Sequence, residues 1–313
     1  MTGKALDTPA PAGGPRDQRP RALIVTLYGL YAREAGGWLS VASVIRLLAH
    51  CQADEPAVRS AIFRLKRRGL LEPARVDGVA GYGLSAEARA ILDEGDRRIF
   101  ERRRATAGDG WLLAVFSVPE SERDQRHRLR SRLAWLGFGT VSAGVWIAPG
   151  HLLGETRDVL RRHGLDRYVE LFRGGHAAFA PTAERVPQWW DLARLRGLYA
   201  DFLDRHGPVL DAYTTAATAA ASPAVLDEAA AFAGYLAALT DWRRLPYAEP
   251  GLPAEVLPEG WNGFRAADTF FGLRDLLAGP AHRFATAALG PASTTAASTA
   301  SPSPAPPATS SGR

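Results

Sequence analysis

The segment from residue 54 to residue 84 constrains the fold of this chain more than any other stretch. Asp54 is a suitable N-cap, and Pro56 fits the first turn of a helix, where a missing N–H is harmless. Gly69 is typical of the position just after a helix ends. Between these signals, apolar residues recur at helical spacing at Val58, Ala61, Ile62 and Leu65. The pattern predicts one amphipathic helix with a single buried stripe.

An extended run follows that helix directly. It begins at Leu70 and Leu71, Asp77-Gly78 is a turn signal, and residues 82–84 can bring the chain back as a second strand. A helix followed at once by a small hairpin is the layout of a winged helix-turn-helix, in which the hairpin is the wing.

The face of the predicted helix opposite its apolar stripe is basic. On a helix that turns about 100° per residue, this face carries Ser60, Phe63, Arg64 and Arg67, with Arg59 and Lys66 beside the stripe. Residues 19–84 hold ten Arg and Lys against five Asp and Glu, a net charge of +5 that equals the formal net charge of the whole chain. A solvated surface helix is the plainer interpretation of such a charge run.

Two earlier helices change that balance of interpretations. The segment Ala22–Glu34 places its apolar side chains on one face: Leu23, Ile24, Leu27, Tyr28 and Tyr31. Gly36-Gly37 interrupts it, and Ser40 can cap a second helix whose stripe is Val41, Val44, Ile45 and Leu48. Three short helices followed by a hairpin are a specific order of elements, which favours contact of the basic face with a nucleic acid.

The ends of the chain differ in composition from its middle. Residues 1–18 are rich in Pro and Gly and residues 287–313 in Ser, Thr, Ala and Pro, so we expect a disordered leader and a disordered tail. The sequence contains neither a signal-like apolar segment nor a run of about 18 apolar residues, which predicts a cytoplasmic protein without membrane contact. Its one cysteine, Cys51, excludes an internal disulfide and is expected at a helix end.

Beyond the predicted winged helix of residues 19–84, the pattern of elements changes twice. Residues 85–110 are expected to form a connecting helix and a linker. Residues 111–180 alternate strand, helix, strand, helix and strand, with one strand region at residues 139–149, which predicts a ferredoxin-like α+β domain. Residues 181–286 predict a helical domain, with helices at 184–206, 224–240 and 264–278 and a connection at 212–222.

Four segments in this order resemble the PaaX family of bacterial transcriptional regulators. They are LIVTLYGLYARE, AVRSAIFRLKRRGLL, WLLAVFSVPESER…LAWLGFG…GVWIAP and LPAEVLPEGW, which together run from about residue 20 to about residue 285. The resemblance implies an α+β multidomain fold: an N-terminal winged helix, a central Cas2-like ferredoxin-fold domain, and a helical C-terminal domain for dimerisation and effector binding. It also implies a homodimeric repressor. The family's best-known member represses phenylacetic acid degradation genes and is released from DNA by phenylacetyl-coenzyme A.

The recognition helix carried over from the family is Glu55–Arg68. The candidate contacts to double-stranded DNA are Arg59, Ser60, Phe63, Arg64, Lys66, Arg67 and Arg68, with Arg75 and Tyr82 from the hairpin. Arg59 and Arg64 are our choices for bidentate contacts to guanine. Phe63 either touches a thymine methyl or packs against the hairpin. One domain buries too little surface for tight binding, so we expect a dimer on a pseudo-palindromic operator.

The effector site is expected among the aromatic residues of the helical domain, although these residues are also natural core or dimer-interface residues. The candidate residues for binding an acyl-CoA effector are Arg194, Arg243, Arg244, Arg265, Trp189 and Trp261. No resident cofactor, metal or catalytic residue is predicted. The alternative function is a Cas2-like nucleic-acid-binding protein or metal-dependent nuclease, but those nucleases carry an acidic metal ligand where this chain has Ser117.

Overall fold

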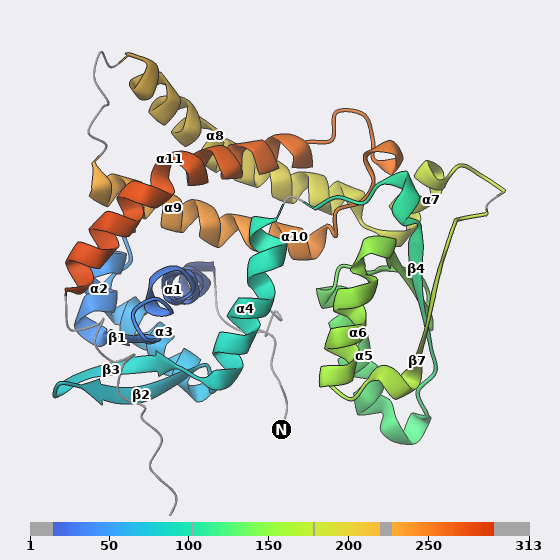
Figure 1. Ribbon diagram of the computed structural model, residues 1–313, viewed down its shortest axis with the longest axis horizontal. Coiled ribbons are helices and arrows are strands. Elements are labelled where there is room, and N and C mark those ends of the chain that lie inside the picture. The colour runs from blue at the N-terminus through green and yellow to red at the C-terminus, as the bar shows by residue number, and fades with distance from the viewer. Residues whose placement is uncertain (1–14, 102, 178, 220–226, 291–313) are drawn as a thin grey trace, which may run out of the picture. The chain divides into compact units, whose positions relative to one another are not determined.

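Helices and strands form two compact units in the computed structural model (Figure 1), which describes residues 15–101, 103–177, 179–219 and 227–290. Among the described residues, the first unit combines residues 15–91 with residues 281–290, and the second spans Leu92–Pro280. The helices α4 (Ala86–Phe100) and α11 (Gly263–Leu289) each begin in one unit and end in the other. In the described part of the chain, no helix combines the length and the apolar character that a membrane span requires.

The first unit follows the predicted order of elements. Its helices are α1 (Pro15–Leu27), a π-helical turn (Tyr28–Ala32), α2 (Val41–Ala49) and α3 (Glu55–Arg67). The hairpin consists of β2 (Leu71–Val76) and β3 (Val79–Leu84). A short strand that sequence analysis missed, β1 (Trp38–Ser40), pairs with β3, so the antiparallel sheet has the order β1-β3-β2.

Local signals account for the bounds of these elements. The hydroxyl of Ser40 accepts a hydrogen bond from the Ser43 N–H at 3.0 Å, which caps α2 as predicted. Asp54 occupies the N-cap position of α3, but its side chain makes no capping hydrogen bond. Gly69 has a φ of 69°, which ends α3. Asp77 and Gly78 both have positive φ, as a two-residue hairpin turn requires.

The predicted apolar stripes form the core of the first unit. All four residues of the α3 stripe and all five of the first helix are buried. In α2 the stripe is shifted, because Leu47 is fully buried whereas Val41 and Ile45 are only partly buried. The hydroxyl of Tyr28, a fully buried residue, donates a hydrogen bond to the backbone carbonyl of Tyr82 at 3.0 Å, which ties the helices to the hairpin.

The last turns of α11 belong to this first unit. The rings of His50 and Phe284 meet edge to face at 4.9 Å, and the rings of Tyr31 and His282 lie 6.3 Å apart. The Arg46 guanidinium donates a hydrogen bond to the Ala288 carbonyl. The first unit is therefore built from both ends of the sequence.

The two predicted disordered ends are shorter than expected where the structure describes them. Because α1 begins at Pro15, residues 15–18 of the expected leader are helical. Because α11 continues to Leu289, residues 287–289 of the expected tail are helical as well. The remaining residues of both predicted segments, apart from Gly290, lie outside the described residues.

The second unit contains a four-stranded antiparallel sheet with the order β5-β6-β4-β7. Its elements are β4 (Trp111–Phe116), α5 (Arg123–Trp135), β5 (Gly139–Ser142), β6 (Val145–Pro149), α6 (Leu153–Arg162) and β7 (Val169–Gly174). This βαββαβ order and strand arrangement are ferredoxin-like. The single strand region predicted at residues 139–149 is a hairpin of two strands. Helices α5 and α6 cover one face of the sheet (Figure 1), where Leu112, Leu129 and Val159 are buried.

The rest of the second unit is helical. It comprises α7 (Thr182–Trp189), α8 (Leu192–Ala219), α9 (Glu228–Trp242), α10 (Leu245–Ala248) and the first part of α11. The helix predicted at residues 184–206 breaks at Trp190, whose backbone is extended, and Asp191 then accepts a hydrogen bond from the Arg194 N–H at 2.9 Å. Helix α8 runs through residues 212–219 of the predicted connection, whose last residues lie outside the described residues.

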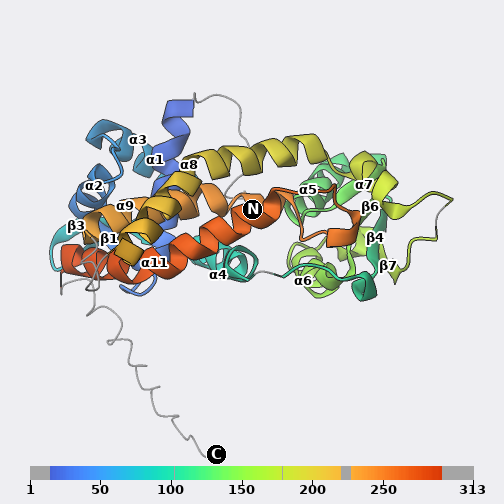
Figure 2. The ribbon, with the colours of Figure 1, turned by 90° about the horizontal axis from the view of Figure 1, so that it is seen from above.

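Aromatic side chains hold the long helices together. Helices α8, α9 and α11 run alongside one another (Figure 2). The rings of Trp242 and Phe270 stack at 4.9 Å between α9 and α11, and Phe202 of α8 lies 5.7 Å from Trp242. Many aromatic residues of the helical segment are therefore core residues, which was the plainer of the two sequence interpretations.

Candidate functional site

The predicted outer face of α3 faces solvent. Arg59, Ser60, Phe63, Lys66 and Arg67 are exposed, and Arg64 and Arg68 are half-buried. The stripe behind them is at most 3% exposed. Helix periodicity thus places several cationic side chains on one accessible surface.

Arg59 is engaged only weakly within its own helix. Its guanidinium forms an ion pair with Glu55 at 2.7 Å, and both side chains are more than half exposed. Exposed pairs four residues apart contribute about 0.3–0.5 kcal/mol and are screened by salt. A phosphate or a guanine can therefore replace Glu55 as the partner of Arg59 at small cost.

Phe63 is a large apolar side chain on this basic surface. It is 56% exposed, so it does not pack against the hairpin in this structure. This exposure leaves a large part of its ring accessible to a partner. A thymine methyl is an apolar group that lies at the surface of the major groove.

The hairpin residues have mainly structural contacts. The Arg75 guanidinium donates a hydrogen bond to the Gly78 carbonyl at 2.9 Å, which holds the turn. Tyr82 is half-buried between its neighbours Leu39 on β1 and Pro73 on β2. The hairpin thus adds less basic surface than α3 does.

Cys51 has little thiolate character. Burial raises the pKa of its thiol to about 11, although nearby Arg19 acts in the opposite direction. A thiol of this kind is protonated at neutral pH and therefore a poor nucleophile. Its place just after α2 agrees with the predicted helix-end role.

The structure scatters the residues predicted for effector binding. Arg194, Arg244 and Arg265 are exposed and Arg243 is half-buried. The ring of Trp189 lies 5.7 Å from that of Trp111 on the sheet, and the ring of Trp261 lies 5.9 Å from that of Tyr199. None of the six residues predicted for effector binding lines the cavity described next.

A cavity of about 550 Å³ lies in the second unit. Its walls come from the last turns of α4, the segment that follows α4, residues 151–158 at the start of α6, and the first turns of α11. Tyr199 of α8, Trp242 of α9 and residues 246–251 complete them. The cavity was not predicted from the sequence, because α4 and the following segment were interpreted as a connection. The four arginines in its walls, Arg97, Arg98, Arg103 and Arg104, all come from that connection.

A buried carboxylate organises one wall of this cavity. Glu249 is 4% exposed and accepts hydrogen bonds from Arg104 at 3.0 Å, from the Tyr199 hydroxyl at 3.1 Å and from the Leu252 N–H at 2.6 Å. Burial, together with the Glu249 charge, raises the pKa of Tyr199 well above its usual value. This network fixes the backbone around the cavity.

His151 lies on another wall. Burial, reinforced by Arg103 and Arg98, lowers the pKa of His151 from 6.5 to about 4, so its ring is neutral at physiological pH. Its Nδ1 atom is buried and has no hydrogen-bond partner among the residues that the structure describes. Burial also raises the pKa of Glu155, which Arg98 opposes from 3.7 Å.

The end of β4 bears on the nuclease alternative. Ser117 follows this strand directly, where a Cas2-like nuclease needs a carboxylate, and Asp124 lies in the first turn of α5. His176 contacts the Thr182 hydroxyl at 3.0 Å, and burial lowers the pKa of His163 to about 4. The described residues contain no cluster of three His, Cys, Asp or Glu side chains arranged for a metal ion.

Family models match this chain in three consecutive segments. The model of a PaaX-like protein matches residues 19–88, the PaaX protein central Cas2-like domain matches residues 104–186, and the PaaX-like protein C-terminal domain matches residues 190–287. The chain belongs to the PaaX family. The segment that matches the PaaX central domain contains the whole ferredoxin-like sheet, which confirms a Cas2-like central domain.

Two similar proteins each cover most of this chain. The transcriptional repressor PaaX of Escherichia coli (strain K12) is 27% identical over 249 residues, which cover 78% of this chain and 76% of the repressor. The uncharacterized protein Rv0674 from Mycobacterium tuberculosis has a similar structure, with a TM-score of 0.53 and 22% identity over 84% of this chain and 97% of that protein. The second similarity concerns the fold alone.

Proposed function

We propose that the protein is a homodimeric, sequence-specific DNA-binding transcriptional regulator, a repressor that an acyl-CoA thioester such as phenylacetyl-CoA releases from its operator. The observation that carries the proposal is the exposed basic face of α3, which is joined directly to a hairpin within the segment that matches the PaaX-like family model. The name of the Escherichia coli relative supports the regulatory role.

In this proposal the first unit acts as a winged helix-turn-helix. Helix α3 enters the major groove, where Arg59 and Arg64 contact guanine and Phe63 contacts a thymine methyl. Lys66, Arg67 and Arg68 neutralise phosphates and release counterions, so the affinity for DNA falls as the salt concentration rises. Arg75 and Tyr82 of the hairpin border this contact.

The homodimer follows from the energetics of recognition. A single small module buries too little surface for specific binding at physiological salt, and a twofold dimer on a pseudo-palindrome doubles the contact. The dimer can adopt a state that fits the operator and a state in which the recognition helices are misplaced. An effector that binds the second state more tightly weakens DNA binding, and the ratio of its two affinities limits the size of this effect. This role requires neither a catalytic residue nor a resident cofactor, and in a bacterium it is carried out in the cytoplasm.

The experiment that tests the function is a gel shift with purified protein and the DNA upstream of its own gene. It is run at two salt concentrations, with and without phenylacetyl-CoA. Arg59→Ala is expected to lower operator affinity about 5- to 150-fold, the equivalent of one bidentate guanine contact. Arg185→Ala, which removes an exposed charge from α7, is the matched control.

The outcomes separate the parts of the proposal. Specific binding that Arg59→Ala weakens and phenylacetyl-CoA relieves supports regulator and effector together. Specific binding that ignores the thioester keeps the regulator and discards this effector. The absence of a specific shift at both salt concentrations contradicts the proposed function and favours the Cas2-like alternative.

A further inference from the structure

The cavity of the second unit has the size of a ligand site. Its volume of about 550 Å³ falls within the range of about 300–1,000 Å³ that is common for small-molecule sites. Every residue in its walls belongs to the second unit, so it is complete within one compact body.

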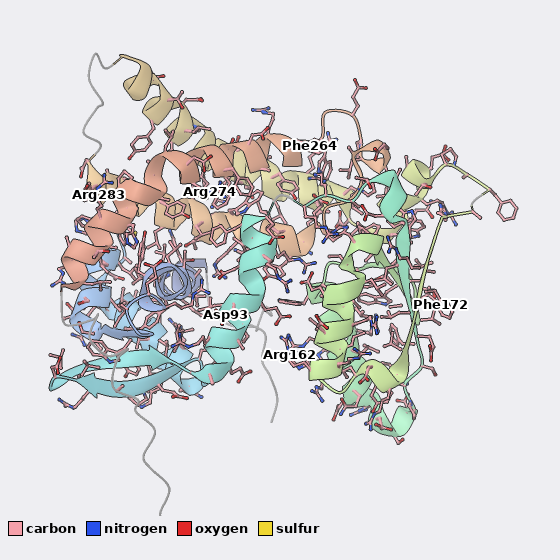
Figure 3. All side chains as sticks on the ribbon, in the orientation of Figure 1. Asp93, Arg162, Phe172, Phe264, Arg274 and Arg283 are labelled. Atoms are coloured by element: carbon pink, nitrogen blue, oxygen red, sulfur yellow. The ribbon has the colours of Figure 1, made fainter. Side chains whose placement is uncertain are left out.

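One side of the cavity is apolar and aromatic. Trp242, Phe264 and Phe271 contribute rings, and the rings of Trp242 and Phe271 meet edge to face at 6.0 Å. Phe264 lies at the start of α11 (Figure 3) and is 37% exposed, although its ring sits 4.4 Å from the Arg104 guanidinium. A flat apolar group can stack on such a wall and remove exposed apolar surface from water.

The arginines of the cavity fall into two classes. Arg98 is committed to the fold, because it donates to the carbonyls of Trp135 and Leu136, and Arg104 is held by Glu249. By contrast, the guanidinium groups of Arg97 and Arg103 make no hydrogen bond or ion pair with any residue that the structure describes. These two guanidinium groups are available to a ligand.

Charge alone does not select the ligand, because Glu101 and Asp158 also line the cavity without a direct partner among the described residues. The surroundings of His151 indicate which ligand charge the cavity favours. Arg103 and Arg98 act on the His151 ring as nearby positive charges, with Asp109 opposing them, and the buried Nδ1 atom of His151 has no hydrogen-bond partner among the described residues. An anionic group beside Arg103 pairs with its guanidinium, and it also accepts a hydrogen bond from His151 in the tautomer that carries its proton on Nδ1.

We propose that this cavity binds a small organic anion that carries a flat apolar group, and that α4 and α11 transmit its occupancy to the DNA-binding unit. The proposal rests on the proposed function, whose effector it places. Acyl-CoA thioesters and free aryl carboxylates share this chemistry, and the experiment distinguishes them.

The transmission follows from the course of the two helices. Helix α4 contributes Arg97 and Arg98 to the cavity and buries Ala88 in the first unit. Helix α11 contributes Phe264 and Phe271 to the cavity, and its later residue Phe284 contacts His50 in the first unit. A ligand in the cavity can favour one position of α4 and α11. Because both helices continue into the first unit, the ligand then has different affinities for different states of that unit, and such a difference is what coupling requires.

The test measures ligand binding directly, by titration calorimetry on the full-length protein without DNA. The probes are phenylacetyl-CoA, phenylacetate and coenzyme A. The variants are Arg103→Glu, which reverses an exposed charge, and Ala267→Trp, which fills the cavity from α11. Each variant is expected to lower the affinity for the binding probe at least about tenfold. Arg185→Ala is the charge control, and circular dichroism checks that the variants are folded.

The results decide the proposal independently of DNA binding. Phenylacetyl-CoA as the binding probe identifies the thioester, and phenylacetate identifies the free carboxylate. Unchanged affinity in both variants, or no binding of any probe to the unaltered chain, overturns the cavity assignment, even if the operator shift is intact. Binding that the variants abolish but that leaves operator affinity unchanged overturns the transmission through α4 and α11. Absence of operator binding contradicts the proposed function, while calorimetry still decides the cavity.

Discussion

At the scale of single residues, the buried carboxylate of Glu249 contributes strongly to the stability of the second unit. Glu249 is almost fully buried, and its oxygens accept from Arg104, Tyr199 and the Leu252 N–H. Glu249→Ala removes the acceptor of the buried Tyr199 hydroxyl and of the Leu252 N–H, and it removes the ion-pair partner of Arg104. Removal of one partner of a buried ion pair costs about 3–5 kcal/mol, so we expect a loss of that size in urea unfolding at neutral pH. Glu259→Ala, at an exposed glutamate of the same loop region, is expected to stay within about 0.5 kcal/mol of the parent.

The histidines predict how stability depends on pH. Burial lowers the pKa values of His151 and His163 from 6.5 to about 4. Between these values the unfolded chain binds protons that the folded chain does not, so the free energy of unfolding contributed by each histidine falls as the pH falls from 6.5 to about 4. Urea unfolding is expected to show lower stability at about pH 5 than at about pH 7, and a smaller difference in His151→Gln. Glu155, whose raised pKa acts in the opposite sense, is present in both proteins. An equal pH dependence in parent and variant contradicts the assignment.

At the scale of elements, the hairpin depends on close approach of backbone atoms. A Cβ added to Gly81 would lie 2.4 Å from the Leu39 carbonyl oxygen and 2.5 Å from the Trp38 ring, whereas one added to Gly83 would meet its nearest atom at 3.7 Å. Gly81→Ala must therefore separate β3 from β1. We expect Gly81→Ala to lower the melting temperature of the first unit and its operator affinity, and Gly83→Ala, in the same strand, to change both little. Equal melting temperatures for the two variants contradict this account.

Elements with strong local signals were predictable from the sequence. The helix α3 and its hairpin have a terminal glycine, a proline in the first turn and a two-residue turn, and each of these acts through its own backbone. Strand β1 has only three residues and is defined by its pairing with β3, which lies about 40 residues further along the chain. It was missed for that reason. The β5–β6 hairpin was merged into one strand because Ala143-Gly144 is a weak turn signal.

At the scale of the whole molecule, sites built from distant segments escaped prediction. The cavity walls come from α4, α6, α8, α9, α11 and residues 246–251, which no local pattern brings together. The exposed basic face of α3, by contrast, lies within one helix and was found from periodicity alone. The physical difference is that a helix face is set by its own geometry, whereas a cavity is set by the packing of several elements.

Truncation tests the composite first unit. A chain that ends at Pro280 loses the fully buried side chains of Ala281 and Ala285 and the ring contacts of His282 and Phe284. We expect faster amide hydrogen exchange in α1 and α2 and weaker operator binding. A chain that ends at Gly290 keeps these contacts and serves as the control. Unchanged exchange in α1 and α2 after truncation at Pro280 contradicts the packing described above.

The return of α11 to the first unit also sets an order of events during protein synthesis. The ribosome makes α1, α2 and α3 long before residues 281–289, which complete the packing around them. A nascent chain can form its basic helix early, but the unit that presents this helix is completed only after residues 281–289 have emerged. Under the proposed function, a translation product without residues 281–289 presents its basic helix from an incompletely packed unit.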